Sequence, residues 1–462
     1  MMLPKIAFRN ILRNARRSLM TLLAIAVGGI SMVLFGEFVG FVQASLETNA
    51  VQNVGHLTVY RKGFFDYGAG NPAAFGIADY GGVMRLIGED PAIAPALRVI
   101  TPTVSLTGIV GNFDIDTSKT FLGTGYVPAD RDTMRRWDEH GVASRRVLGD
   151  SGLRADDESF GVVGVGLARV LGLCAPLRIP DCPPRPMLPT AVASNAGPVP
   201  DVPVETDAPA PAASGAPRLD LLAATVSGAP NVMSLHVTRA EPQAARELDE
   251  NVVVMNFTLA QKLLYGRGEP RATGLVMQLH RTEDLAPVRG RLAALFAKHH
   301  LDLEVRDFAE REPFYKQAVG MFSAIFLFLS LIMGVIVLFT VVNTMGTSVV
   351  ERTSEIGTAR AMGLRRGGVR RMFVLEGAML GALGATAGIA LGQLVAILFN
   401  STRSTWTPPA SAAPVPLEVL TTHVGGLLAA VWLALVITAT VAAVVPANRA
   451  ARLKVVDALR HV

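Results

Sequence analysis

The sequence has few of the residue patterns that enzymes use in their active sites. Only two of its 462 residues are cysteine, and it contains no Cys/His spacing of the zinc-finger type. The phosphate-binding pattern G-x-x-x-x-G-K-[ST] is absent, as are H-E-x-x-H and G-x-S-x-G. We therefore expect that the chain is not an enzyme and that it binds no cofactor or metal of its own.

Charge is also scarce for a chain of this length. Only 18% of the residues are charged, whereas 50% are hydrophobic, and soluble domains carry about 25% charged residues. The net charge is +5, and the basic residues gather beside apolar runs instead of forming basic tails. This pattern indicates orientation in a membrane, and we expect no nucleic-acid partner.

Four apolar runs are each long enough to cross a bilayer core, which takes about 20 residues. We expect transmembrane helices at 18–42, 371–399 and 423–445, and a stalk followed by a transmembrane helix at 316–349. A secretory signal peptide is the alternative interpretation of the first run, because residues 42–44 loosely resemble a cleavage site.

The basic segments predict which side each loop faces. Segment 350–370, between the second and third runs, holds five arginines and two glutamates and is followed directly by Arg371, so the positive-inside rule makes it cytoplasmic. Residues 1–17 and the tail 446–462 are also basic, which predicts that both termini are cytoplasmic. Residues 1–17 are expected to form an interfacial amphipathic helix or a plain topogenic segment. The region 43–315 and the short loop 400–422 then face outside.

The long region 43–315 is expected to fold into an α+β domain, because short alternating strands interleave with helical patterns. Within it, residues 180–217 contain eleven of the 28 prolines and are expected to form an exposed, disordered loop. Cys174 and Cys182 lie on the oxidising side. A disulfide between them is favoured, and a reactive or metal-binding pair is the alternative.

The segment after the second run has the features of a short amphipathic helix. Glu351 and Glu355 lie one turn apart at its start, where acidic groups favour a helix N-terminus. Gly363 is expected to end the helix. An apolar stripe lies between these points at helical spacing: Ile356, Ala359 and Met362. The segment is either a solvated connector or a coupling helix that docks on a cytoplasmic partner.

Side chains near the outer ends of the first two runs are candidates for contact with a transported molecule. Glu37 either reaches the lipid headgroups or lines the cavity of a dimer. Aromatic residues on both runs are either ordinary lipid-facing residues or a surface for lateral access of an apolar cargo: Phe35, Phe38, Phe41, Phe322 and Phe326.

Glycine recurs along the third run at intervals of four residues. Small residues at this interval let two helices approach closely, either within one subunit or across a dimer. The glycines are Gly377, Gly381, Gly384, Gly388 and Gly392.

The motif E-R-T-S-E-I-G-T-A-R-A-M-G-L-R-R at 351–366 resembles the signature of the FtsX/MacB/LolC-LolE group of ABC-transporter permeases. The resemblance continues through the glycine-rich run. It includes I-A-F-R-N-I-L-R-N-A-R-R-S-L-M-T-L-L-A-I at 6–25 and P-A-N-R-A-A-R-L-K-V-V-D-A-L-R at 446–460. These segments cover under half of the chain, and they fall in the family's order.

The resemblance implies an α-helical membrane protein of the bacterial inner membrane. Its four transmembrane helices would carry a large α+β periplasmic domain inserted between helices 1 and 2. In similar permeases this domain is divided, which here suggests porter-like parts at about 43–95 and 230–315 and an inserted subdomain at about 95–230.

In that family, segment 350–370 is the helix inserted into the ATPase. The positions that match the motif are Glu351, Arg352, Glu355, Ile356, Gly357, Arg360 and Gly363. The resemblance thus implies two copies of a cytoplasmic ABC ATPase, which would bind ATP and Mg, and a second permease copy or a paralogue. Membrane lipid and a periplasmic adaptor or carrier protein are further partners that it allows.

The resemblance favours transport driven by mechanotransmission, in which nucleotide-driven motion inside moves the periplasmic domains. The absence of a nucleotide-binding motif makes the chain most similar to LolC/LolE-like permeases, which implies lipoprotein release. Two alternatives remain: efflux of a peptide, an antibiotic or another amphiphile, and FtsX-like signalling to cell-wall hydrolases, against which the large outer region counts.

Overall fold

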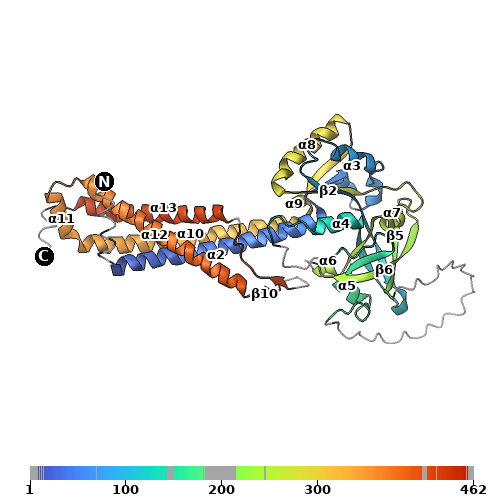
Figure 1. Ribbon diagram of the computed structural model, residues 1–462, viewed down its shortest axis with the longest axis horizontal. Coiled ribbons are helices and arrows are strands. Elements are labelled where there is room, and N and C mark those ends of the chain that lie inside the picture. The colour runs from blue at the N-terminus through green and yellow to red at the C-terminus, as the bar shows by residue number, and fades with distance from the viewer. Residues whose placement is uncertain are drawn as a thin grey trace, which may run out of the picture. The chain divides into compact units, whose positions relative to one another are not determined.

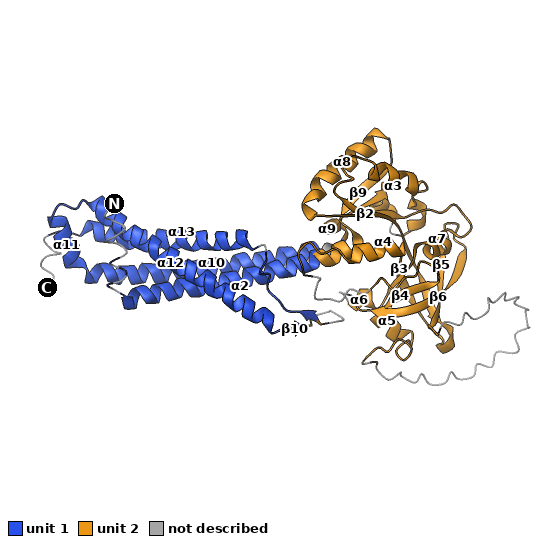
Figure 2. Cartoon of the chain, in the orientation of Figure 1, with its two compact units in different colours: residues 1–47, 312–406, 415–462 blue, residues 48–311, 407–414 orange. Residues whose placement is uncertain are grey.

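The computed structural model describes residues 9, 11, 13, 15–68, 70–142, 150–180, 182, 215–243, 246–407, 414–422, 424–453 and 455. Most of the predicted interfacial helix 1–17 and of the proline-rich loop 180–217 lies outside the described residues, as does the end of the predicted tail. The chain forms two compact units, which are coloured separately in Figure 2. Unit 1 comprises residues 1–47, 312–406 and 415–462, and unit 2 comprises residues 48–311 and 407–414.

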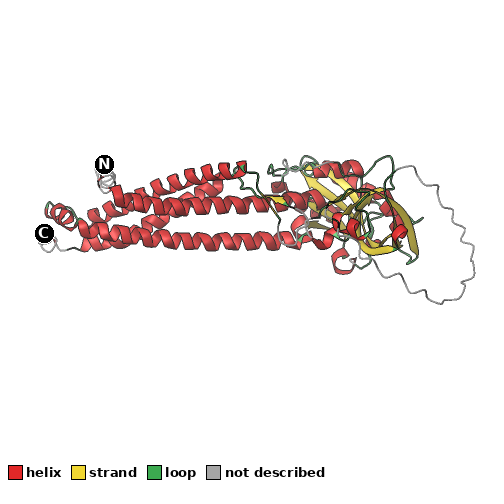
Figure 3. Cartoon of the chain, turned by 90° about the horizontal axis from the view of Figure 1, so that it is seen from below, coloured by secondary structure: helices red, strands yellow, loops and turns green. Residues whose placement is uncertain are grey.

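Unit 1 is built from four long helices that lie side by side (Figures 1 and 3). They are α2 (Ala15–Val54), α10 (Pro313–Glu351), α12 (Arg366–Ser401) and α13 (Gly425–Arg452). All four are long and apolar enough to cross a membrane. The 40 residues of α2 measure about 60 Å, whereas a bilayer core is about 30 Å thick. The protein is therefore a multi-pass membrane protein with at least one helix that continues beyond the hydrocarbon.

The glycines of α12 bring it into backbone contact with two neighbours. An added Cβ at Gly377 would lie 2.4 Å from the Cβ of Ala443 on α13. An added Cβ at Gly388 would lie 2.7 Å from the backbone oxygen of Ala26 on α2. Gly381 faces α13, and Gly384 and Gly392 face α2. Both contacts lie within one chain, so the glycine pattern is used inside the subunit.

Unit 2 contains a four-stranded antiparallel sheet in the order β9-β1-β8-β2. The strands are β1 (Leu57–Arg61), β2 (Leu97–Asn112), β8 (Gly274–Leu279) and β9 (Leu303–Asp307). Helices α3 (Tyr80–Gly88) and α8 (Leu285–Lys298) contact β2 and β9, respectively. Val83 and Ile87 of α3 and Val288, Leu292, Leu295 and Phe296 of α8 are buried in the core of this unit.

The long strand β2 also belongs to a second sheet, which closes on itself. Around the circle, β2 pairs with β3, β3 with β7, β7 with β4, β4 with β6, β6 with β5, and β5 with β2. These strands are β3 (Thr117–Tyr126), β4 (Phe160–Gly164), β5 (Arg218–Ala224), β6 (Pro230–Glu241) and β7 (Val252–Asn256). A closed barrel has no unpaired edge strand, and Phe121 and Leu106 are buried in its core.

The barrel corrects the predicted division of the region between α2 and α10. We expected the inserted subdomain at about 95–230 and the second porter-like part at about 230–315. Strands β6 and β7 instead pair with barrel strands, so the barrel continues to Asn256 and the second part of the four-stranded sheet begins at β8. The error arose because strand pattern alone does not reveal which strands pair.

Besides four short 3-10 and π-helices, the described chain contains shorter α-helices and strands. They are α4 (Pro128–Arg135), α5 (Val165–Val170), α6 (Arg246–Asp249), α7 (Phe257–Tyr265), α9 (Phe308–Arg311), α11 (Thr353–Ala361), β10 (Thr405–Trp406) and β11 (Val415–Pro416). The fold is thus the expected one: four transmembrane helices with a mixed α/β domain between the first and the second.

Candidate functional site

The short helix α11 joins α10 to α12 at one end of the bundle (Figure 1). Arg352 separates α10 from α11. After Ala361 the chain turns at Gly363, whose φ of +98° lies in the left-handed region that glycine adopts without strain. Gly363 donates its backbone N–H to the carbonyl of Arg360 at 3.0 Å. The residue predicted to end the helix therefore forms the turn that follows it.

One face of the α11 segment packs against the bundle. Arg352, Ile356 and Gly357 are buried, with Arg352 only 7% exposed. A guanidinium nitrogen of Arg352 donates to Glu376 on α12 at 3.3 Å, and both side chains are buried. The same guanidinium lies 5.5 Å from the ring centroid of Phe373. Arg352, Ile356 and Gly357, which the resemblance assigns to the coupling helix, thus lie on the side of the segment that packs against the bundle.

The two glutamates of the motif form ion pairs with the N-terminal segment of the same chain. Arg13 donates to both carboxylate oxygens of Glu355 at 2.5 Å, and Arg17 donates to Glu351. Burial by itself would raise the pKa of Glu355, but the hydrogen bonds and charges of Arg13 and Arg352 outweigh it, so the pKa is lowered. All four paired side chains are 41–55% exposed, and exposed pairs of this kind contribute about 0–1 kcal/mol.

A last contact ties α11 to α13. Arg360 donates to the backbone oxygen of Leu453, directly after the end of α13. Counting this contact, the segment from Glu351 to Gly363, which contains α11, is joined to all four long helices: Glu351 is the last residue of α10 and pairs with Arg17 of α2, Arg352 pairs with Glu376 of α12, and Arg360 contacts Leu453 directly after α13.

The exposed surface of this segment differs from the predicted apolar stripe. Ile356 is buried, but Met362 is 79% exposed because α11 ends at Ala361 and the helical period stops there. Ser354, Thr358, Ala361 and Arg365 are also exposed. Helical spacing placed Met362 on the same stripe as Ile356. Gly363 is the sequence feature that shows otherwise, because it marks a turn one residue after Met362.

The phenylalanines near the other end of the spans contact one another across α2 and α10. Phe35 and Phe326 stack with ring centroids 6.3 Å apart, and Phe38 and Phe322 meet edge to face at 6.2 Å. Gln43 extends the same contact with a 3.1 Å hydrogen bond to Ser323. Phe41 makes no ring contact within the described part of the chain. The proposed access surface is thus a seam between two helices of one chain.

Glu37 has a different environment from either predicted one. It is fully buried, accepts a hydrogen bond from the side chain of Gln393 on α12, and accepts another at its backbone oxygen from Leu420 at 3.1 Å. It therefore neither reaches the headgroups nor lines an open cavity of this chain. The prediction failed because it considered only the position of Glu37 along α2. The side of α2 on which Glu37 lies, which packs against α12, depends on how the helix is rotated about its axis.

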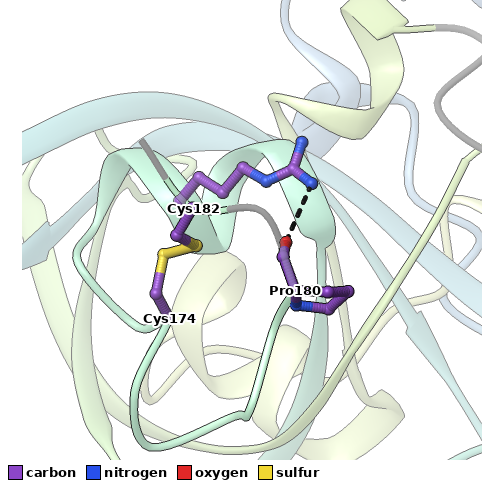
Figure 4. The surroundings of a disulfide bond; sticks show 4 residues. Cys174, Pro180 and Cys182 are labelled. Atoms are coloured by element: carbon purple, nitrogen blue, oxygen red, sulfur yellow. Dashed lines mark hydrogen bonds between the residues drawn. A yellow bond between two sulfur atoms is a disulfide. The ribbon is translucent and has the colours of Figure 1, made fainter. Parts of the chain in front are cut away.

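In unit 2, Cys174 and Cys182 are joined by a disulfide with a Cα–Cα distance of 6.2 Å (Figure 4). The bond closes a small loop that follows α5. Arg169 of α5 donates a hydrogen bond to the backbone oxygen of Pro180 in this loop at 3.5 Å. Most of the proline-rich segment beyond this loop is not among the described residues. The disulfide fixes the point from which that segment departs.

Comparisons with known proteins agree with this geometry. The model of the FtsX-like permease C-terminal domain matches residues 326–455, which run from α10 through α11 and α12 to the end of α13. The chain thus contains the membrane region of a permease. Its membrane region is similar to that of FtsX/MacB-like ABC-transporter permeases.

Similar curated proteins include three that bear the name macrolide export ATP-binding/permease protein MacB. The one from Escherichia coli is 29% identical over 136 residues, which cover 29% of this chain and 21% of that protein. Those from Chlorobaculum tepidum and a Shewanella species are 27% and 30% identical over 223 and 213 residues. The matches cover 47% and 44% of this chain and 32% and 30% of the relatives. The chain therefore spans less than a third of the length of these relatives.

Proposed function

We propose that this chain is the transmembrane subunit of a mechanotransmission-type ABC transporter. A separate cytoplasmic ATPase would dock on α11, bind ATP and Mg, and hydrolyse the nucleotide, while this chain performs no catalysis. The observation that carries the proposal is that the segment from Glu351 to Gly363, which contains α11, contacts all four long helices through side chains or chain continuity. Two ATPase copies and a second permease copy or paralogue would complete the assembly.

The docking surface of the proposal is the exposed part of the α11 segment. Met362 supplies an apolar contact, and Ser354 and Thr358 supply polar ones. Motion imposed there would reach the bundle through the buried Arg352–Glu376 pair. Helices α2 and α10 would carry it onward, since these two helices continue into the chain segments that form unit 2.

We place the protein in the bacterial inner membrane with both termini in the cytoplasm and unit 2 in the periplasm. The arginines in and around α11 and at the end of α13 support this orientation, because cytoplasmic loops carry an excess of arginine and lysine. The disulfide of unit 2 is consistent with an oxidising compartment.

The docking proposal is tested by changing Met362 without disturbing the bundle. Met362→Asp should abolish the stimulation of the ATPase by this chain in proteoliposomes and leave the folded bundle intact. Met362→Leu, which keeps an apolar side chain, should retain it. Full coupled activity of Met362→Asp would show that the ATPase does not dock on this surface.

For the cargo we propose the lipid anchor of a lipoprotein, released from the membrane during the ATPase cycle. Export of a macrolide or a comparable amphiphile is the second candidate, because the curated relatives are named as macrolide exporters. Either cargo would reach the chain beside the seam between α2 and α10, with a periplasmic carrier or adaptor receiving it.

Photo-crosslinking separates the two cargoes. A photoreactive phenylalanine analogue at Phe38 or Phe326 should capture an acylated lipoprotein before ATP is added and lose it afterwards. The same analogue at Phe328, which is 63% exposed on α10 outside the seam, serves as the control for random capture from the membrane. Capture of a labelled macrolide alone would support the second candidate. A periplasmic hydrolase bound to the chain without any cargo would instead favour FtsX-like signalling.

A further inference from the structure

A groove of about 880 Å³ lies between α10 and α13, at the end of the bundle that carries α11. Its volume falls within the range of small-ligand sites, about 300–1,000 Å³. The groove is lined by Phe339, Thr340, Val342, Asn343, Thr344, Gly346, Thr347, Val349, Val350, Thr353, Pro446, Arg449 and Leu453. All of these residues belong to unit 1.

The lining on α10 is unexpectedly polar for a membrane-spanning helix. Thr340, Asn343, Thr344 and Thr347 follow one another at intervals of three, one and three residues, which places them on one face. The threonine hydroxyls donate to carbonyls of their own helix. The side chain of Asn343 is exposed and has no hydrogen-bond partner within the described residues. A polar amide that faces lipid is costly and points to a polar ligand.

The positive charge of the groove favours an anionic ligand. Arg449 is the only charged residue that lines it, and no carboxylate does. Arg449 is exposed and forms no salt bridge among the described residues, in contrast to Arg352 and Arg17. The rest of the lining includes the apolar side chains of Phe339 and Val350, which are 66% and 73% exposed. One cation, one free amide and an apolar border match a molecule with an anionic head and a hydrocarbon tail.

We propose that this groove binds an anionic phospholipid of the inner leaflet. Arg449 would bind the phosphate, Asn343 would donate to a headgroup oxygen, and an acyl chain would lie against Phe339 and Val342. The assignment to the inner leaflet rests on the orientation given under the proposed function. Because Leu453 lines the groove and also accepts the hydrogen bond of Arg360 from α11, the lipid would contact the element on which the ATPase is proposed to act.

The test uses the purified full chain without any ATPase, so its outcome is independent of the docking experiment on Met362. Lipid binding is measured by native mass spectrometry after incubation with phosphatidylglycerol or phosphatidylcholine. We expect selective retention of phosphatidylglycerol. Arg449→Gln should weaken that retention by about fivefold, the equivalent of about 1 kcal/mol per basic residue at an anionic membrane surface. Asn343→Leu should weaken it by a smaller factor.

The matched control is Arg452→Gln, which removes an exposed arginine of the same helix that does not line the groove. Equal losses for Arg449→Gln and Arg452→Gln would overturn the proposal, since they would show general attraction to basic residues. Equal retention of the two lipids would overturn it as well. Displacement of the lipid by millimolar inorganic phosphate would also overturn it, because it would indicate a site for free anions. A disulfide between two copies of the Asn343→Cys variant would overturn it too, because it would show that a second subunit covers the groove.

Discussion

Units 1 and 2 are stabilised by different kinds of contact. In unit 2, a closed barrel and a four-stranded sheet enclose large apolar side chains, and the hydrophobic effect in water drives their burial. In unit 1, α12 packs closely on α2 and α13 through glycine and alanine, in addition to a cluster of larger apolar side chains. Close packing matters there because the hydrophobic effect does not drive helices together in lipid. The comparison explains why the two regions have such different compositions although one chain forms both.

Helix α11 follows neither pattern. Apart from buried Ile356 and Gly357, it is held by charged side chains. Its ion pair with Arg13 is about half exposed, as is the pair of Arg17 with Glu351 just before it. Such contacts contribute about 0–1 kcal/mol each, so a partner protein can replace them at small cost. Helix α11, the element proposed to respond to the ATPase, is therefore held at its surface by weaker contacts than those in the cores of the two units.

The largest effect is expected in the barrel. Phe121 is 1% exposed within the core of unit 2, so Phe121→Ala should lower the free energy of unfolding by about 3–5 kcal/mol. This change is measured by thermal unfolding of the purified protein, with the protease resistance of unit 2 as the probe. Phe113→Ala is the control, since Phe113 is 75% exposed and its loss should change stability by less than about 0.5 kcal/mol. Similar losses for both variants would contradict the assignment of the core.

A comparable effect is expected from breaking the one buried charge pair between α12 and Arg352. Arg352→Met or Glu376→Leu alone removes one charge of this buried pair and should destabilise the bundle by about 3–5 kcal/mol. The double variant removes both charges and should recover most of that loss. Thermal unfolding in detergent measures all three. If the double variant is as unstable as the sum of the single variants, the two side chains do not interact.

A smaller effect should distinguish glycine contacts from open helix surface. Gly388→Leu places a side chain against the backbone of Ala26 and should destabilise the bundle by about 1–3 kcal/mol through overpacking. An added Cβ at Gly334 on α10 meets no atom within 4 Å, so Gly334→Leu should be tolerated. Both are compared by thermal unfolding in the same detergent. Loss of stability in Gly334→Leu alone would mean that α10, and not α12, is the closely packed helix.

The smallest effect concerns the ion pair of α11. The pKa of Glu355 is lowered from its ordinary value of 4.5, so the pair stabilises α11 above that pH and is lost as the pH falls through the lowered pKa. Hydrogen exchange of α11, corrected for intrinsic rates, should therefore increase relative to that of α13 as the pH falls below 4.5. Glu355→Gln should show the increased exchange at every pH. An unchanged pH response in Glu355→Gln would assign the effect to another group.

Much of the architecture follows from local sequence. The four spanning helices are read from apolar runs, because a bilayer demands about 20 apolar residues in succession wherever the chain crosses it. Gly363 marks the turn after α11, since few other residues adopt its backbone conformation. The spacing of the glycines in α12 predicted close helix packing, although it did not reveal the partners.

The tertiary structure alone decided which side chains face each other. It showed that β6 and β7 belong to the barrel, that Glu37 packs against Gln393, and that the acids of the motif pair with Arg13 and Arg17, more than 300 residues away in sequence. Periodicity within one segment fixes a face of a helix or strand but not the element that covers it. Strand partners, helix rotation and long-range ion pairs are therefore settled only when the whole chain is packed.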